Sequence, residues 1–90
     1  MDFYLVNIII VDKDDNIKTI NKIFHRQQRA RIEFLSLQDI LRVHLATFYK
    51  VSFEDFDIEE FGDIEVNDDY MTYKDFEGLH NVRIEIKTIL

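Results

Sequence analysis

An almost continuous apolar stretch near the N-terminus, Phe3–Val11, contains a single polar residue, Asn7. Both alternating sets of its side chains are apolar, which is typical of a strand covered on both faces. The stretch is far shorter than the roughly 18–20 residues that span a bilayer, and Asp2 precedes it where a signal peptide would carry basic residues. We therefore predict a central buried strand over 3–11 in a cytoplasmic protein, with no membrane partner.

Length and composition predict one folded domain over residues 1–90. The chain is 47% hydrophobic and 13% aromatic, which is too apolar for a disordered protein. It contains no cysteine, and this excludes a disulfide framework, a thiol nucleophile and a cysteine-bearing metal site. A core of this size leaves a modest margin of stability, so a homodimer is one expectation.

The next elements are a turn and a segment with two possible conformations. Residues 12–16 are rich in turn-forming side chains. In residues 16–26, Ile17, Ile20 and Phe24 have helical spacing, whereas the many β-branched side chains favour a strand. We favour a β-hairpin with 3–11, although a tight hairpin usually contains glycine and this one has none. Residues 82–89 alternate strictly between apolar and polar, which indicates a half-buried strand.

The strongest helical pattern covers residues 37–49, with Ser36 as its N-cap. Its expected buried stripe is Leu37, Ile40, Leu41, Leu45 and Phe48, and its expected solvent-facing residues are Gln38, Asp39, Arg42 and Lys50. Similar capping patterns predict short helices from Ser52 to Gly62 and from Thr72 to Gly78. The predicted fold class is α+β: an antiparallel sheet of three or four strands with the 37–49 helix packed on one face.

Charge is distributed unevenly along the chain. The sequence has 18 acids against 11 Lys and Arg residues, a net charge of −7, and residues 51–79 hold eleven of the acids and one base. Large apolar side chains alternate with these acids, which indicates a folded element, helical or extended, with a charged outer face. The candidate partner-binding residues in this acidic, aromatic-rich segment are Glu54, Asp55, Phe56, Asp57, Glu59, Glu60, Phe61, Asp63, Glu65, Asp68 and Asp69.

Other chemistry receives little support from the sequence. The segment 12–16 resembles the opening of a calcium loop, but Ile17 and Ile23 replace the glycine and glutamate that such a loop requires. The three histidines are widely spaced, and His44 falls within the expected apolar stripe, where a structural role is common. No phosphate-binding loop, nucleophile elbow or zinc-hydrolase motif is present. We therefore predict no enzymatic activity, no catalytic residues, no metal and no cofactor.

The one basic cluster in the sequence is Arg26, Arg29 and Arg31. Three arginines in a chain of net charge −7 give weak attraction to phosphates, so we expect no direct contact with nucleic acid. We expect these arginines to pair with the protein's own acidic face.

Two functions fit an exposed acidic face. It can mimic nucleic acid and block a basic nucleic-acid-binding protein or nuclease, with Phe56 or Phe61 as apolar anchors. Alternatively, it serves only to solubilise a structural or self-associating accessory subunit, which would pair through the edges of 3–11 or 82–89. We favour the first function, non-enzymatic inhibition of a basic protein partner. The composition, rich in Ile, Asp and Lys, is compatible with a phage or other accessory protein.

Overall fold

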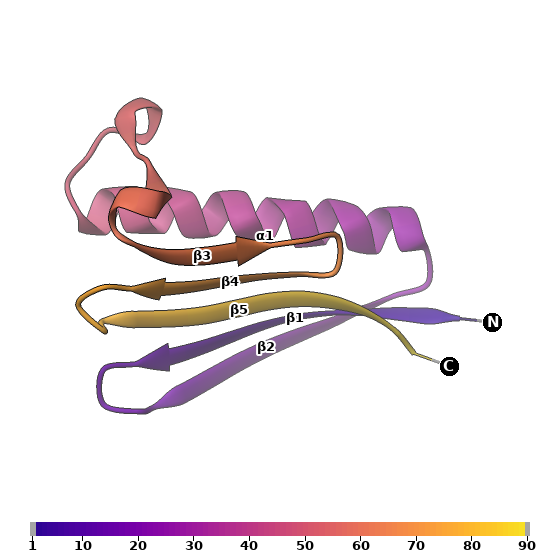
Figure 1. Cartoon of the computed structure of the whole chain (residues 1–90). Coiled ribbons are helices and arrows are strands. Elements are labelled where there is room, and N and C mark those ends of the chain that lie inside the picture. Colours follow the sequence, from indigo (N-terminus) through magenta and orange to yellow (C-terminus); the bar gives the residue numbers. More distant parts are fainter. Residues whose placement is uncertain (1, 90) are drawn as a thin grey trace.

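In the computed structural model, which describes residues 2–89, one long helix lies against one face of a five-stranded antiparallel sheet (Figure 1). The elements are β1 (Phe3–Asp12), β2 (Ile17–Phe24), α1 (Gln27–Phe48), the 3₁₀ turns η1 (Phe53–Asp55) and η2 (Ile58–Glu60), β3 (Gly62–Val66), β4 (Tyr70–Asp75) and β5 (His80–Ile89). The strand order is β2-β1-β5-β4-β3, so β5 is central and β2 and β3 are the edges. The α+β class is confirmed, and the sheet has more strands than we predicted because β3 and β4 form an additional hairpin.

The hairpin of β1 and β2 confirms the favoured interpretation of residues 16–26, with a register from Val11 opposite Ile17 to Tyr4 opposite Phe24. Asp15 takes the left-handed conformation, φ 61°, that glycine would otherwise supply. The Asp12 carboxylate accepts hydrogen bonds from the backbone N–H groups of Asp14, at 2.9 Å, and Asn16, at 3.0 Å. The bonds from Asn16 lower the pKa of Asp12. An aspartate-capped turn therefore replaces the glycine turn.

Residues 3–11 form an interior strand of the sheet, as predicted, but the prediction that both of its faces are covered is wrong. β1 lies between β2 and β5, one strand from the edge. Its face with Val6 contributes to the core under α1, whereas no helix or further sheet of residues 2–89 covers the face with Leu5 and Ile9 (Figure 1). The polar Asn7 on this second face is buried by its neighbours and hydrogen-bonds to Glu85 on β5.

The helix begins ten residues before the predicted start, and its buried stripe is rotated. Ala30, Phe34, Gln38, Leu41 and Leu45 are buried, at spacings of three and four residues. Gln38, predicted to face water, is only 5% exposed, whereas Ile40, predicted to be buried, is 61% exposed. Ser36 is an interior residue rather than an N-cap. The contacts of the first two turns orient the helix, and they outweigh the local capping pattern.

In place of the two short helices predicted after α1, the structure has two 3₁₀ turns and the end of a strand. Between Ser52 and Gly62 the chain forms η1 and η2 separated by extended residues, and the Asp57 side chain caps η2 by accepting from the Glu59 N–H at 3.1 Å. Residues 72–78 form the end of β4 and a turn, because Met71, Tyr73 and Asp75 alternate into the buried layer. The predicted strand over 82–89 is confirmed as β5, and its Val82, Ile84 and Ile86 join the core.

No helix within residues 2–89 combines the length and the apolar character needed to cross a membrane.

Candidate functional site

Nine acids gather along one edge of the molecule. They lie on η1, on η2 and its N-cap, on the edge strand β3 and on the turn between β3 and β4 (Figure 1). We call this surface the acidic edge: Glu54, Asp55, Asp57, Glu59, Glu60, Asp63, Glu65, Asp68 and Asp69, all of which are exposed. The sequence-predicted acids are therefore brought together on one continuous segment at the surface.

The carboxylates of the acidic edge form few interactions within the protein. Asp55 accepts from the Ser52 hydroxyl, Asp57 caps η2, and Glu65 accepts from the Tyr70 hydroxyl. This last bond raises the pKa of Tyr70. The ion pairs of residues 2–89 all lie elsewhere and involve Glu33, Asp39, Asp75 and Glu85. The carboxylates of the acidic edge consequently form no ion pair in the part of the chain described, and on the neighbouring strand Lys74 stands opposite Asp63.

The two aromatic residues that we predicted as anchors are packed into the protein. Phe61 stacks on Tyr49 with ring centroids 4.3 Å apart, and Phe56 stacks on Phe61 at 5.3 Å. Both are only partly exposed. The exposed aromatic residue within the acidic edge is Phe53, at 53%. The sequence places Phe53 directly before Glu54. It does not show that Phe53 is the accessible ring, because this depends on the packing of Phe56 and Phe61 against Tyr49.

The expectation that the arginine cluster pairs with the acidic face is not met. Within residues 2–89, Arg26, Arg29 and Arg31 form no ion pair with the acidic edge. Arg31 instead donates to the backbone carbonyl of Asp68. Arg26 is the N-cap residue of α1, directly after β2, and β3 is at the opposite edge of the sheet.

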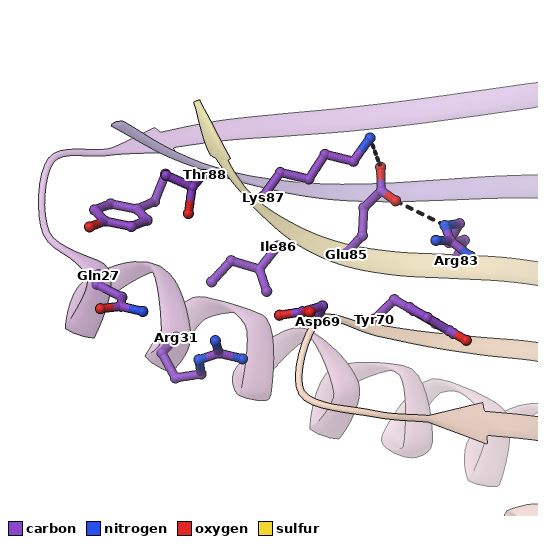
Figure 2. A pocket seen from close by; sticks show the side chains of 10 residues that line it. Gln27, Arg31, Asp69, Tyr70, Arg83, Glu85, Ile86, Lys87 and Thr88 are labelled. Carbon is purple, nitrogen blue, oxygen red and sulfur yellow. Dashed lines mark hydrogen bonds and ion pairs between the residues drawn. The ribbon is translucent and has the colours of Figure 1, made fainter. Parts of the chain in front are cut away.

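A cavity of about 490 Å³ opens where the acidic edge meets the first turn of α1 (Figure 2). Arg31, Asp69, Arg83, Glu85 and Lys87 contribute its charged lining. Glu85 is already bound by Arg83 at 2.9 Å and by Lys87 at 3.3 Å. The cations of the cavity are therefore largely occupied by the protein's own carboxylates, and the lining favours neither an anionic nor a cationic ligand.

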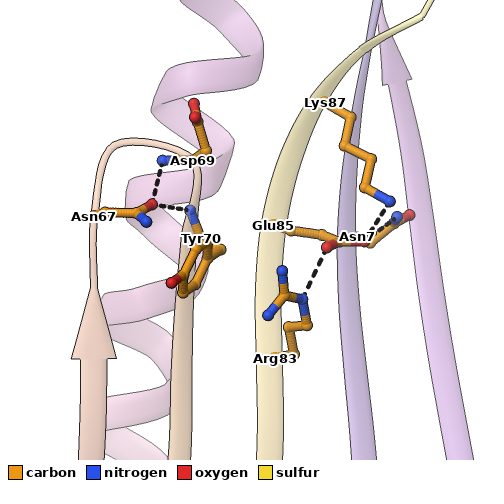
Figure 3. Close-up of polar contacts among 7 residues, drawn as sticks. All are labelled: Asn7, Asn67, Asp69, Tyr70, Arg83, Glu85 and Lys87. Carbon is orange, nitrogen blue, oxygen red and sulfur yellow. Dashed lines mark hydrogen bonds and ion pairs between the residues drawn. The ribbon is translucent and has the colours of Figure 1, made fainter.

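The Glu85 carboxylate is the centre of a polar network on the uncovered face of the sheet (Figure 3). It accepts from Asn7 at 3.1 Å as well as from Arg83 and Lys87, and the Arg83 guanidinium lies over the Tyr70 ring at 4.6 Å. Burial acts to raise the pKa of Glu85, but the hydrogen bonds from Arg83, Asn7 and Lys87 outweigh it and lower that pKa. This network fixes β5 against its neighbours and presents no free reactive group.

A second buried carboxylate, Asp75, orients a histidine under the end of α1. It accepts from the Tyr49 hydroxyl at 2.9 Å and from the Leu79 N–H at 2.6 Å, and His80 Nδ1 lies 2.7 Å away. Burial opposes the charge of Asp75, but these hydrogen bonds prevail and hold its pKa below the ordinary value. Burial and the neighbouring carboxylate raise the pKa of Tyr49. Nothing in the sequence marked this cluster, because its members come from separate elements.

The Asp75–His80 pair also changes our view of the histidines. His44 is exposed rather than buried in the helix stripe, and its ring lies 5.8 Å from that of His80. The described residues nevertheless contain no group of three or more side chains that could hold a metal ion. The hydrogen bonds of the cluster join Tyr49, at the C-terminal end of α1, to Asp75 on β4, and Asp75 to His80 on β5.

Comparison of the chain with models of protein families, with curated proteins and with solved structures finds no match.

Proposed function

We propose that the chain is a non-enzymatic binding protein of the cytoplasm, whose acidic edge occupies the basic groove of a nucleic-acid-binding protein or nuclease. The observation that carries the proposal is the set of nine exposed carboxylates that form no ion pair within residues 2–89. An unpaired cluster of one sign attracts a partner of the opposite sign and accelerates its association.

The charge spacing favours the 3₁₀ half of the acidic edge as the contact. Residues 54–60 carry five acids. The two 3₁₀ turns rise about 2 Å per residue and the extended Phe56 and Asp57 between them about 3.3 Å, so the charges follow one another every ~3–4 Å along the chain. A single strand of DNA carries one charge per ~3.4 Å of helix axis. Asp63 and Glu65 on β3 are spaced at roughly twice that distance, since a strand rises about 3.3 Å per residue. Lysines and arginines positioned for phosphates can therefore meet carboxylates at η1 and η2.

Phe53 supplies the apolar contact that charge alone lacks. It is exposed on η1 beside Glu54 and Asp55, whereas Phe56 and Phe61 are occupied in packing. A ring removed from water at the centre of a charged interface contributes binding energy that salt does not screen. Binding would then exclude nucleic acid by direct competition for the same cations.

The proposal is tested with a variant whose changes leave the fold intact. Glu54, Glu59, Glu60, Asp63 and Asp68 have carboxylates with no hydrogen bond within residues 2–89, so they are changed together to their amides. A matched control changes the same number of acids elsewhere to amides: Asp2, Asp14, Asp15, Asp39 and Glu77, all exposed. Both variants must show the circular dichroism spectrum of the wild type.

The measurement is affinity capture from a bacterial lysate, with and without competitor duplex DNA. We expect wild type and control to retain basic nucleic-acid-binding proteins that competitor DNA releases, and we expect the acidic-edge variant to lose them. Raising the salt concentration should weaken capture steeply. Equal capture by all three forms, or capture indifferent to DNA, would overturn the proposal and leave the acidic edge as a solubilising surface.

A further inference from the structure

β2 is the unprotected edge of the sheet. It is eight residues long, all of its residues except Phe24 are exposed, and it contains no proline and no acid. Ile17 is 71% exposed and Ile23 is 62% exposed. Natural proteins block such edges with charge, proline, bulges or a covering element, because an open strand pairs with other chains. β2 has no proline, acid or bulge, and its only charges are Lys18 and Lys22, which lie on the side of the sheet that faces α1. β3, in contrast, is short and carries Asp63 and Glu65.

The backbone of β2 is available for pairing. The N–H of Asp12 donates to the carbonyl of Asn16 at 3.1 Å, which sets the hydrogen-bonding phase of the hairpin. Because bonded and non-bonded pairs alternate in an antiparallel ladder, Lys18, Ile20 and Lys22 bond to β1. The N–H and carbonyl groups of the odd-numbered residues of β2 then point away from the sheet.

The sequence of β2 is complementary to itself. We propose that two copies of this chain pair through β2, antiparallel about a twofold axis at Ile20, and form one continuous sheet. In this register Ile17 of each copy lies opposite Ile23 of the other, and the two Ile20 side chains face each other. The odd-numbered residues provide roughly eight hydrogen bonds between the chains. Three cross-strand isoleucine pairs leave water, and burial of their apolar surface stabilises the contact.

The proposed register also determines which charged side chains of the two copies face each other. The same register places Lys18 opposite Lys22 of the other chain, on the side of the sheet that faces α1. Lys22 is paired with Glu33 of α1 at 2.9 Å, whereas Lys18 has no ion pair within residues 2–89. Glu33 can therefore stand between Lys22 and the incoming Lys18, and this offsets part of the repulsion between the two lysines.

The position of β2 keeps the acidic edges apart. β2 and β3 lie at opposite edges of the sheet, so a contact through β2 places the two acidic edges at the far ends of the dimer. Pairing through β3 would instead bring Asp63 and Glu65 of both copies together. Segregation of charge to one edge thus allows a strongly acidic chain to associate with itself, with both acidic edges still free.

The first test is the mass of the full chain by sedimentation equilibrium, at concentrations from about 1 to 100 µM. We expect a rise from the monomer mass of 10.9 kDa to about 22 kDa, the value for a twofold dimer. Ile23→Lys should abolish the rise. Ile40→Lys is the matched control, because Ile40 is 61% exposed on the outer face of α1, and it should leave the dimer unchanged. Thr19→Pro, which removes an outward N–H only, should act like Ile23→Lys.

The second test uses the absence of native cysteine. Facing residues of a non-bonded antiparallel pair have Cα atoms ~4.5 Å apart, which is within the range of a disulfide. Ile20→Cys should therefore give a covalent dimer on mild oxidation, and Ile40→Cys should not.

Three results would overturn the inference. If the wild-type chain stays monomeric at every concentration, the proposed dimer does not form. If Ile40→Lys loses the dimer and Ile23→Lys keeps it, the contact lies on α1 rather than on β2. Faster crosslinking of Asn21→Cys than of Ile20→Cys shows that the axis does not pass through Ile20. Circular dichroism of each variant distinguishes a lost contact from a lost fold.

Discussion

The β3 edge and the β2 edge of the same sheet are built in opposite ways. β3 has five residues and stands beside the acidic turns, and it is attached to the core through Gly62, Ile64 and the neighbouring Phe61. β2 has eight residues, no acid, and few contacts outside its hairpin partner β1. One edge is thus charged outward beside the acidic turns, while the other carries no acid and is held by its ladder with β1, by Phe24 and by the Lys22–Glu33 ion pair.

This difference shows how a small domain can separate two kinds of interaction. A cluster of like charge repels other strands, so the acidic edge resists sheet extension while it attracts cations. β2 carries no acid, and the exposed isoleucines beside Lys18 and Lys22 favour pairing with another strand. Substitutions that destabilise one edge and leave the other unchanged test whether the stabilities of the two edges are independent.

The largest effect is expected at Gly62, where β3 starts. A Cβ atom at this position would lie 2.5 Å from the Lys74 carbonyl oxygen and 2.7 Å from the Asp75 Cα. Gly62→Val must therefore push β3 from β4, and we expect the free energy of unfolding to fall by about 3 kcal/mol in urea denaturation.

Gly78→Ala is the control for this variant. Gly78 has φ 74° and no atom within 4 Å of the added Cβ, so only backbone strain of about 1 kcal/mol is expected. If the two variants cost the same, close packing of β3 on β4 is not what fixes this edge.

A smaller effect, dependent on pH, is expected at Asp75, which joins β4 to β5 and to the end of α1. Its pKa is below the ordinary value of 3.8 in the folded chain, so its contribution is fully present above that value and is lost as the pH falls through the folded pKa. Asp75→Asn should lower the free energy of unfolding by about 2 kcal/mol at pH 7, because a neutral amide forms weaker hydrogen bonds than the buried carboxylate.

The pH profile checks this assignment. The unfolding free energy of wild type should decrease below about pH 4, and Asp75→Asn should show a shallower decrease over the same range. Glu85, whose pKa is likewise lowered, remains in the variant and accounts for the residual slope. A variant with the wild-type slope would show that Asp75 does not govern the acid sensitivity of the fold.

The sequence allowed prediction of elements whose patterns are set locally. The strict alternation of residues 82–89 identified β5, and the dense β-branched content of residues 17–23 favoured β2 over a helix. The exposure of the nine acids also followed from their charge, since unpaired carboxylates are rarely buried.

What could not be predicted depends on contacts between distant elements. The first turns of α1 are stabilised by the burial of Ala30 and Phe34 under the sheet, which no local pattern records. Thr72 and Asp75 have the spacing of a helix cap, but pairing with β5 decides in favour of a strand. In the candidate site, Phe53 replaces Phe56 and Phe61 as the exposed ring because Tyr49, from another element, occupies the stack.

The smallest effect is expected from one matched pair of substitutions, one on each edge. Ile64 on β3 is half-buried against the core, and Ile17 on β2 is 71% exposed. At low protein concentration, Ile64→Ala should cost about 1–2 kcal/mol of unfolding free energy, and Ile17→Ala should cost less than about 0.5 kcal/mol. At concentrations where β2 pairs, the cost of Ile17→Ala should grow, because Ile17 then leaves water, while that of Ile64→Ala should stay constant. A cost for Ile17→Ala that does not depend on concentration would mean that Ile17 stabilises only the hairpin, and the open edge would lose its role in association.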